Sequence, residues 1–339
     1  MLPQVTATRY VTPLREGGSL PGLMEADDFG TYVVKFRGAG QGRKALVAEV
    51  ISARLARVCG LLVPDLVAVD LDPGLAAGEP DQEIQDLLRA SGGLNLGVDF
   101  LAGAVDFDAA AAGVSGELAG RIIWFDALVS NADRSWRNPN MLFWREGLYL
   151  IDHGATLTYQ HRWESAGAAA GRRYDIADHA LVGCAPWIED ADRLLADRIT
   201  PEVLREAVAA VPDEWLEPEP GLDRPAAVRQ AHVRQLTARL ENREAWLTGL
   251  REMASQPGLP RREAAAPVRP FWLTPSPRRR TIGSGGTTTR NPPRIPPGET
   301  IPRNPPRIPP GGTTPRNPPR IPPGGTTPRN PPQDGEVAR

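Results

Sequence analysis

The last quarter of this 339-residue chain is a proline-rich repeat, which most limits what the chain can fold into. From Arg290 the sequence Arg-Asn-Pro-Pro-Arg-Ile-Pro-Pro-Gly recurs every 13 residues, restarting at Arg303 and Arg316. Proline fixes φ and has no amide hydrogen, so neither a helix nor a sheet can run through such repeats. Too few apolar residues are present to build a core. The sequence therefore predicts disorder over 275–339, with short stretches of polyproline II.

The net charge of the chain changes sign near the start of the proline-rich region. Residues 255–339 hold 23 of the 36 prolines, and residues 251–339 carry 15 arginines against five acids, a net charge of +10. This leaves 24 basic and 36 acidic residues in 1–250, a net charge of −12. We therefore expect a folded acidic body and a disordered, proline- and arginine-rich repeat tail over 255–339.

The repeat also has the spacing of a known kind of ligand. Arg290, Pro293 and Pro296 are each three residues apart, as in ligands of aromatic grooves that bind polyproline. A polyproline-binding protein is therefore one candidate partner of the tail. A solvated linker and a weak electrostatic anchor are the alternatives.

Several classes of protein are excluded by what the sequence lacks. No window approaches 18 consecutive apolar residues, so no membrane span is expected, and the start of the chain lacks the pattern of a secretion signal. Two cysteines, Cys59 and Cys184, are too few for a disulfide framework, which favours a cytoplasmic location. The acidic body contains no nucleic-acid-binding motif, so no specific nucleic acid is expected as a partner.

The body begins with strand patterns and continues with helical ones. Strands are predicted at 32–36, 66–70, 141–144 and 148–151. Helices are predicted at 44–59, 117–129, 175–183, 188–197, 201–210 and 225–250. This order indicates an α+β protein with a small β-rich N-terminal lobe over 1–102, which would bind nucleotide. A larger, helical catalytic lobe would follow over 103–254, with a cleft between the two.

The strongest chemical signal is a polar loop and the hairpin that follows it. The loop contains Asp133 and Arg134, with Asn138 and Asn140 five and seven residues after Asp133, and the hairpin leads to Asp152. Phosphoryl transfer needs a carboxylate that orients the attacking hydroxyl and oxygen ligands that hold Mg²⁺ on the phosphates. Asp133 is predicted for the first role. Asp152 with Asn138 or Asn140 is predicted for the second, and a glycine following Asp152 is expected to allow a sharp turn there.

These motifs resemble those of kinase-fold enzymes, which share an Asp-x-x-x-x-Asn loop, a hairpin and an Asp-x-Gly metal site. Residues 10–250 are similar to bacterial HipA-like kinase-domain proteins, and the loop also resembles that of the phosphoinositide kinases. The motifs, in order, are residues 13–22, Tyr32-Val33-Val34-Lys35-Phe36, Asn131-Ala132-Asp133-Arg134 and Ile151-Asp152-His153-Gly154. The resemblance implies a bilobal kinase-like fold, ATP and Mg²⁺ as cofactors, and a protein Ser/Thr hydroxyl as acceptor.

Lysine usage gives an independent argument. The chain has 37 arginines but only two lysines, Lys35 and Lys44. A compact ammonium fits a tight phosphate site better than a guanidinium fork does. Lys35, in a predicted strand, is therefore expected to contact the α- and β-phosphates of a nucleotide, as the strand lysine of kinases does. Its partner should be Glu49, because no other acid lies between Asp28 and Asp65.

Three further assignments concern residues 17–19 and Arg134. Gly17, Gly18 and Ser19 precede the strand of Lys35, and backbone amides in glycine-rich turns can cradle phosphates. The resemblance to HipA-like kinases implies that Ser19 could itself accept phosphate. Arg134 is predicted to act in catalysis by screening the Asp133 carboxylate or the transferred phosphate, with a structural ion pair as the alternative.

The leading hypothesis is thus an ATP- and Mg²⁺-dependent kinase that transfers the γ-phosphate to a hydroxyl, by resemblance that of a protein serine or threonine. One alternative is a catalytically silent scaffold that binds nucleotide. Another is a kinase that acts on a lipid or a small molecule. The sequence alone leaves the acceptor open.

Overall fold

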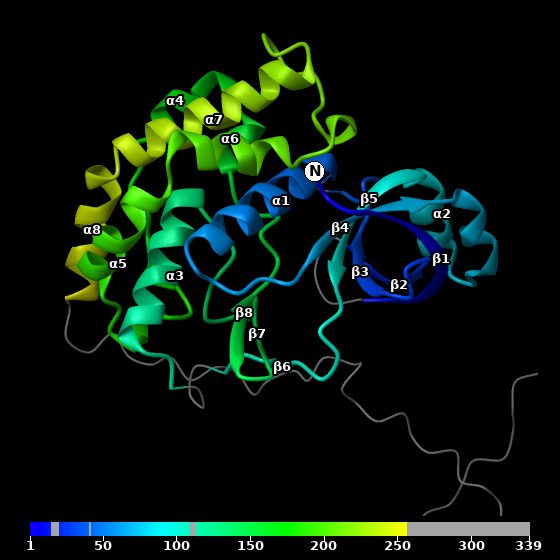
Figure 1. The fold of residues 1–339 in the computed structure, drawn as a ribbon, viewed down its shortest axis with the longest axis horizontal. Helices are drawn as coiled ribbons and strands as arrows, with labels where there is room; N and C mark the ends of the chain where they lie inside the picture. Colours follow the sequence, from blue (N-terminus) through cyan, green and yellow to red (C-terminus); the bar gives the residue numbers. More distant parts are fainter. Residues whose placement is uncertain (15–19, 41, 109–112, 256–339) are drawn as a thin grey trace, which may run out of the picture. The chain divides into compact units, whose positions relative to one another are not determined.

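The computed structural model describes residues 1–14, 20–40, 42–108 and 113–255. The predictions for residues 17–19 and for the tail repeats lie outside these residues. The strands are β1 (Gln4–Pro13), β2 (Gly22–Ala26), β3 (Thr31–Lys35), β4 (Leu66–Leu71), β5 (Gly93–Asp99), β6 (Val105–Asp106), β7 (Met141–Trp144) and β8 (Gly147–Leu150). The α-helices are α1 (Gly42–Val58), α2 (Gln82–Ala90), α3 (Gly116–Val129), α4 (Ala166–Ala169), α5 (Ile188–Leu195), α6 (Pro201–Ala209), α7 (Pro225–Glu241) and α8 (Glu244–Ala254). This mixed content confirms the α+β expectation (Figure 1).

The first five strands form a closed barrel in the order β1-β2-β3-β5-β4. Adjacent strands of the barrel pair antiparallel, except β1 and β4, which pair in parallel and close the barrel. In β2 and β3 every second side chain is buried, which is the period of a strand with one face in a core. Met24, Val34 and Leu71 lie in that core, and α2 adds Ile84 and Leu88. The barrel therefore holds Lys35 at the end of β3 on a rigid element.

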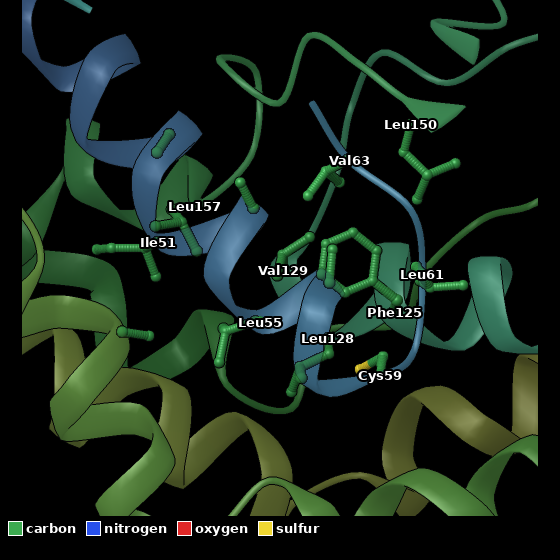
Figure 2. Packing of buried hydrophobic residues seen from close by; sticks show 14 of the residues in the cluster. Ile51, Leu55, Cys59, Leu61, Val63, Phe125, Leu128, Val129, Leu150 and Leu157 are labelled. Atoms are coloured by element: carbon green, nitrogen blue, oxygen red, sulfur yellow. The ribbon is translucent and has the colours of Figure 1, made fainter. Parts of the chain in front are cut away.

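A second, larger core joins α1 to the helices and to the β7–β8 hairpin. Figure 2 shows part of this cluster, with Ile51 and Leu55 from α1, Phe125 and Leu128 from α3, and Leu150 from β8. All five side chains are nearly or fully buried. Although α1 directly follows β3 in sequence, it packs in the core of the helical part. The predicted lobe boundary at residue 102 stays a prediction.

Several predicted elements differ from those observed. The helix predicted at 175–183 is absent: that stretch holds turns and a short 3-10 helix at Val182–Cys184. The helix predicted at 225–250 is two helices, because α7 ends at Glu241. The next residue, Asn242, caps it: its side-chain amide donates to the Ala238 carbonyl at 2.8 Å. Strands β1 and β2 and helix α2 were not predicted. Within the described residues, no helix is long and apolar enough to cross a membrane.

His232 is a buried titratable group that makes the folded protein sensitive to acid. It lies on α7, and its Nδ1 is 3.0 Å from the Tyr159 hydroxyl. Burial lowers its pKa from 6.5 to about 3. A group whose pKa is lower in the folded state contributes stability above its unfolded pKa, and that stability is lost as the pH falls below 6.5 toward 3.

We therefore expect the free energy of unfolding to fall by about 2 kcal/mol between pH 7 and pH 5 through His232. Urea unfolding at the two pH values measures this loss. His232→Gln cannot titrate, so the pH dependence of that variant should be smaller by the same amount. An unchanged pH dependence in the variant would show that His232 is not the responsible group.

Candidate active site

Lys35 connects three parts of the chain that are far apart in sequence. Its Nζ donates to Glu49 Oε1 on α1 at 2.5 Å and to Asp152 Oδ1, two residues beyond β8, at 2.7 Å. The contact with Glu49 is the one that the sequence predicts. The Lys35 and Glu49 side chains are 13% and 4% exposed, whereas that of Asp152 is 46% exposed. A positive charge and a solvent-facing carboxylate thus lie side by side.

Burial and charge determine the ionisation of this cluster. Burial alone would lower the pKa of Lys35, but the carboxylates of Glu49 and Asp152 raise it well above its usual value. The Lys35 ammonium lowers the pKa of Asp152 in turn. The neighbouring His153 is buried, which lowers its pKa to about 3 and leaves it neutral near pH 7. Lys35 and Asp152 are therefore both charged at neutral pH, as binding of phosphate and of a cation requires.

The Asp133 carboxylate is held through one of its two oxygens. Asp133 Oδ2 accepts hydrogen bonds from the side-chain amides of Asn138 at 3.0 Å and Asn140 at 3.3 Å. The backbone amide of Asp133 donates to Asn131 Oδ1 at 3.0 Å. The described residues supply no hydrogen bond to Asp133 Oδ1, and the residue is partly exposed. That oxygen is free to accept a hydrogen bond from a hydroxyl group.

The two candidate asparagines differ in their relation to Asp152. Asn140 directly precedes β7, and its carbonyl accepts from the Ile151 amide at 3.0 Å, so the hairpin brings it beside the residue before Asp152. Asn140 and Asp152 both have a positive φ, 48° and 54°, a conformation that Asn and Asp tolerate better than most residues. Asn138 is exposed. Asp152 itself adopts the left-handed conformation, and Gly154 lies in the turn that follows it.

Arg134 does not have the position predicted for a catalytic residue. Its side chain is completely buried, and Nε donates to Asp126 Oδ2 on α3 at 2.7 Å. Its Nη1 donates to the Asn140 carbonyl at 2.6 Å. A guanidinium enclosed in this way cannot contact a transferred phosphate, so the structural ion pair is the better interpretation. The same oxygen, Asp126 Oδ2, also lies 3.0 Å from Nε2 of His179, 53 residues later in the chain.

Two surface pockets in the described part of the chain are lined by residues other than Lys35, Asp133 and Asp152. One, of about 370 Å³, is lined by Trp163, Leu222 and Ala238 among others. The other is lined by Lys44, Trp215 and neighbouring side chains. Lys35, Asp133 and Asp152 line neither, so the predicted cleft stays a prediction. Within the described ranges, no three or more His, Cys, Asp or Glu side chains lie close enough together to hold a metal ion.

Several solved structures of kinases are similar to this chain. A search of curated proteins finds no match. Among solved structures, the Helicobacter pylori proinflammatory kinase CtkA matches with 11% identity and a TM-score of 0.44, over 74% of this chain and 98% of that one. The Golgi casein kinase matches with 13% identity and a TM-score of 0.34, over 72% of this chain and 73% of that one. Its structure with Mn/ADP bound matches with 13% identity and a TM-score of 0.35, over 74% and 75%.

The family comparison covers most of the body. The sequence model of the HipA-like kinases matches residues 8–248, a range that contains Lys35, Asp133 and Asp152. This range agrees closely with the resemblance inferred over residues 10–250. The chain belongs to the HipA-like kinase family.

Proposed function

We propose that this protein is an active kinase that transfers the γ-phosphate of ATP to a hydroxyl group, with protein serine and threonine as the acceptor class. The contact of Lys35 with both Glu49 and Asp152 is the observation that carries the proposal. A buried ammonium between a buried and an exposed carboxylate is costly to build. Kinases use this pattern to bind phosphates and a cation.

Lys35 is the group proposed to bind the α- and β-phosphates. Its Nζ can donate three hydrogen bonds, and Glu49 fixes it from the buried side. Arginine could not replace it without loss, because a guanidinium is wider and its donors have a fixed fork geometry. Gly17, Gly18 and Ser19 are proposed to bind the phosphates through their backbone amides.

The residues around Asp152 fit a divalent cation. Asp152 offers a partly exposed carboxylate and Asn140 an amide oxygen, and Mg²⁺ prefers oxygen ligands of this kind. When bound, the ion would neutralise charge on the phosphates. Between the two asparagines we favour Asn140, because the hairpin connects it to Ile151. Asn138 would instead orient Asp133, to which it donates at 3.0 Å.

Asp133 is proposed to orient the acceptor hydroxyl and to accept its proton. The hydroxyl oxygen then forms a bond to the γ-phosphorus while the bond from that phosphorus to the β,γ-bridging oxygen breaks, and ADP leaves. Oδ1 of Asp133 is the oxygen left without a hydrogen bond by the described residues. Asn138 and Asn140 hold the other oxygen, so the carboxylate keeps one orientation.

The remaining expectations belong to the same proposal. The barrel within 1–102 would bind the nucleotide, and 103–254 would supply the catalytic loop and the cation site. The tail over 255–339 would act separately, with a polyproline-binding protein as its candidate partner. The enzyme would work in the cytoplasm.

The proposal is tested by incubating the full chain with [γ-³²P]ATP, Mg²⁺ and a cell lysate. We expect label on serine or threonine of one or a few proteins, and no label with Asp152→Ala. Label in a lipid or a small metabolite would overturn the proposed acceptor class. Binding of ATP without transfer to any acceptor would favour the silent scaffold.

A further inference from the structure

One buried carboxylate, that of Asp126, connects the parts of the proposed catalytic centre. Asp126 lies on α3 and is fully buried. Its Oδ1 accepts from the Asn131 side-chain amide at 2.8 Å. Its Oδ2 accepts from Arg134 Nε at 2.7 Å and lies 3.0 Å from His179 Nε2. Each carboxylate oxygen therefore holds at least one side chain of the loop 131–140, here called the catalytic loop, and Oδ2 also contacts a side chain of the later segment 174–181.

Two of these partners, Asn131 and Arg134, also form hydrogen bonds with the residues proposed to act as the base and to bind the cation. Asn131 Oδ1 accepts from the backbone amide of Asp133 at 3.0 Å. Arg134 Nη1 donates to the carbonyl of Asn140 at 2.6 Å. Asp126 is thus one side chain removed from the backbone of Asp133 and one side chain removed from the backbone of Asn140.

The third partner, His179, has a defined hydrogen-bonding state. The Leu181 amide donates to its Nδ1 at 3.1 Å, so Nδ1 is the acceptor. In the neutral ring the hydrogen is then on Nε2, which donates to Asp126 Oδ2. The backbone around His179 fixes the tautomer that this contact requires.

The segment 174–181 contacts the catalytic loop along its length. The Tyr174 hydroxyl donates to the Asn131 carbonyl at 2.8 Å, and the Trp136 amide donates to the Asp178 carbonyl at 2.9 Å. A bridge also pairs Ser135 with His179. The Asp178 carbonyl and the bridge at His179 use backbone groups that a helix at 175–183 would have paired internally, so these contacts compete with the predicted helix.

The Asp126 carboxylate remains charged in this surrounding. Burial alone would raise its pKa, but Arg134 and a hydrogen bond from His179 lower it to about 2. A fully buried ion pair is weak evidence for stability, because apolar side chains of the same volume are often as stable. Specific positioning of the groups at its ends is the better explanation for this pair.

We propose that Asp126 is a positioning residue that fixes the base Asp133 through Asn131 and the cation ligand Asn140 through Arg134. His179, through its contact with the same carboxylate, holds segment 174–181 next to the catalytic loop. This inference rests on the proposed function for the roles of Asp133 and Asn140. The hydrogen-bond network itself is independent of that function.

The two connections predict two separable defects. Arg134→Lys keeps the buried charge but loses the fork that reaches Asn140. We expect its half-saturating Mg²⁺ concentration to rise about tenfold, with turnover restored at high Mg²⁺, since loss of a residue that orients a metal ligand lowers metal affinity about 10–100-fold.

Asn131→Ala removes the side chain that accepts the hydrogen bond from the Asp133 amide. We expect its turnover to fall about tenfold or more at every Mg²⁺ concentration, with the half-saturating concentration unchanged.

Arg239→Lys is the matched control for Arg134→Lys. Arg239 is also buried, and its guanidinium donates to backbone carbonyls, those of Ala127 and Arg172 among them, but not to the loop 131–140. It should lose stability without a change in Mg²⁺ dependence. An equal shift in both lysine variants would overturn the connection through Arg134.

Two readouts do not depend on turnover. Affinity for Mn²⁺–ADP, measured by calorimetry, should fall in Arg134→Lys and stay unchanged in Asn131→Ala. Hydrogen exchange of amides in 131–140 should speed up in Asn131→Ala and in His179→Ala, with exchange in the barrel strands unchanged. His179→Gln, whose amide can still donate to Asp126, should restore slow exchange.

Unchanged exchange over 131–140 in Asn131→Ala would overturn the positioning role of Asp126. A wild-type protein that transfers no phosphate would overturn the proposed function instead, while exchange and Mn²⁺–ADP binding would still decide the positioning. Asp126→Asn is the direct variant, and it should reproduce both defects if it folds. The Arg134 and Asn131 variants decide the question if it does not.

Discussion

Replacing Asp133 by asparagine is expected to lower phosphate transfer by about 10²–10⁴-fold, the usual contribution of a positioned acid–base group. The amide has the shape of the carboxylate but neither its charge nor its capacity to accept a proton. Nucleotide affinity should stay close to that of the wild type, because Lys35, Glu49 and Asp152 are untouched. The measurement is initial-rate transfer from labelled ATP, with nucleotide affinity measured separately by calorimetry.

Asp197→Asn is the control for this substitution. Asp197 is exposed and lies in the short 3-10 helix after α5, so the same chemical change there should leave transfer unaltered. Transfer near the wild-type rate in Asp133→Asn would remove Asp133 from the mechanism. Loss of transfer together with loss of nucleotide binding would indicate a folding defect, which the melting temperature would detect.

The sequence predicts the contact between Lys35 and Glu49 because lysines are rare in this chain and few acids lie near Lys35 in sequence. A lysine in a strand stands out in a chain with 37 arginines, and Glu49 is the one acid in the stretch between Asp28 and Asp65. The observed contact of 2.5 Å agrees with that argument. The contact of Lys35 with Asp152, 117 residues later, follows from the order of motifs and not from any local pattern.

Spacing alone could not separate Asn138 from Asn140. Both are within reach of Asp133, and counting from Asp133 favours Asn138, whereas the strand that follows favours Asn140. The difference appears only once β7 and β8 pair and the Asn140 carbonyl meets the Ile151 amide. Register between strands is set by the folded hairpin, so a local pattern does not contain it.

Long-range hydrogen bonds also account for the elements that were predicted wrongly or missed. Residues 175–183 look helical, but their backbone pairs with the catalytic loop, for example through the amide of Ala180 and the carbonyl of Arg134. Strand β1 completes its pairing only by lying parallel to β4, more than 50 residues away. Tertiary contacts of this kind override local propensity.

Replacing Lys35 by arginine, which keeps the positive charge, is expected to lower phosphate transfer by about 10²–10³-fold, as loss of one preorganised donor does. The site that encloses Nζ is small: the Lys35 side chain is 13% exposed and touches carboxylates on two sides. A guanidinium there must displace Asp152 or lose Glu49. Because charge is conserved, overall stability should change less than transfer does.

Lys44→Arg is the matched control, since Lys44 is the other lysine of the chain. Its Nζ donates to the Gln160 carbonyl at 3.0 Å and pairs with Glu219 at 2.6 Å, away from Asp133 and Asp152. Transfer by Lys44→Arg should therefore equal that of the wild type, and ADP affinity should fall in Lys35→Arg alone. If both variants kept full activity, the site would need only a positive charge at residue 35. The scarcity of lysine would then carry no information about phosphate binding in this arginine-rich chain.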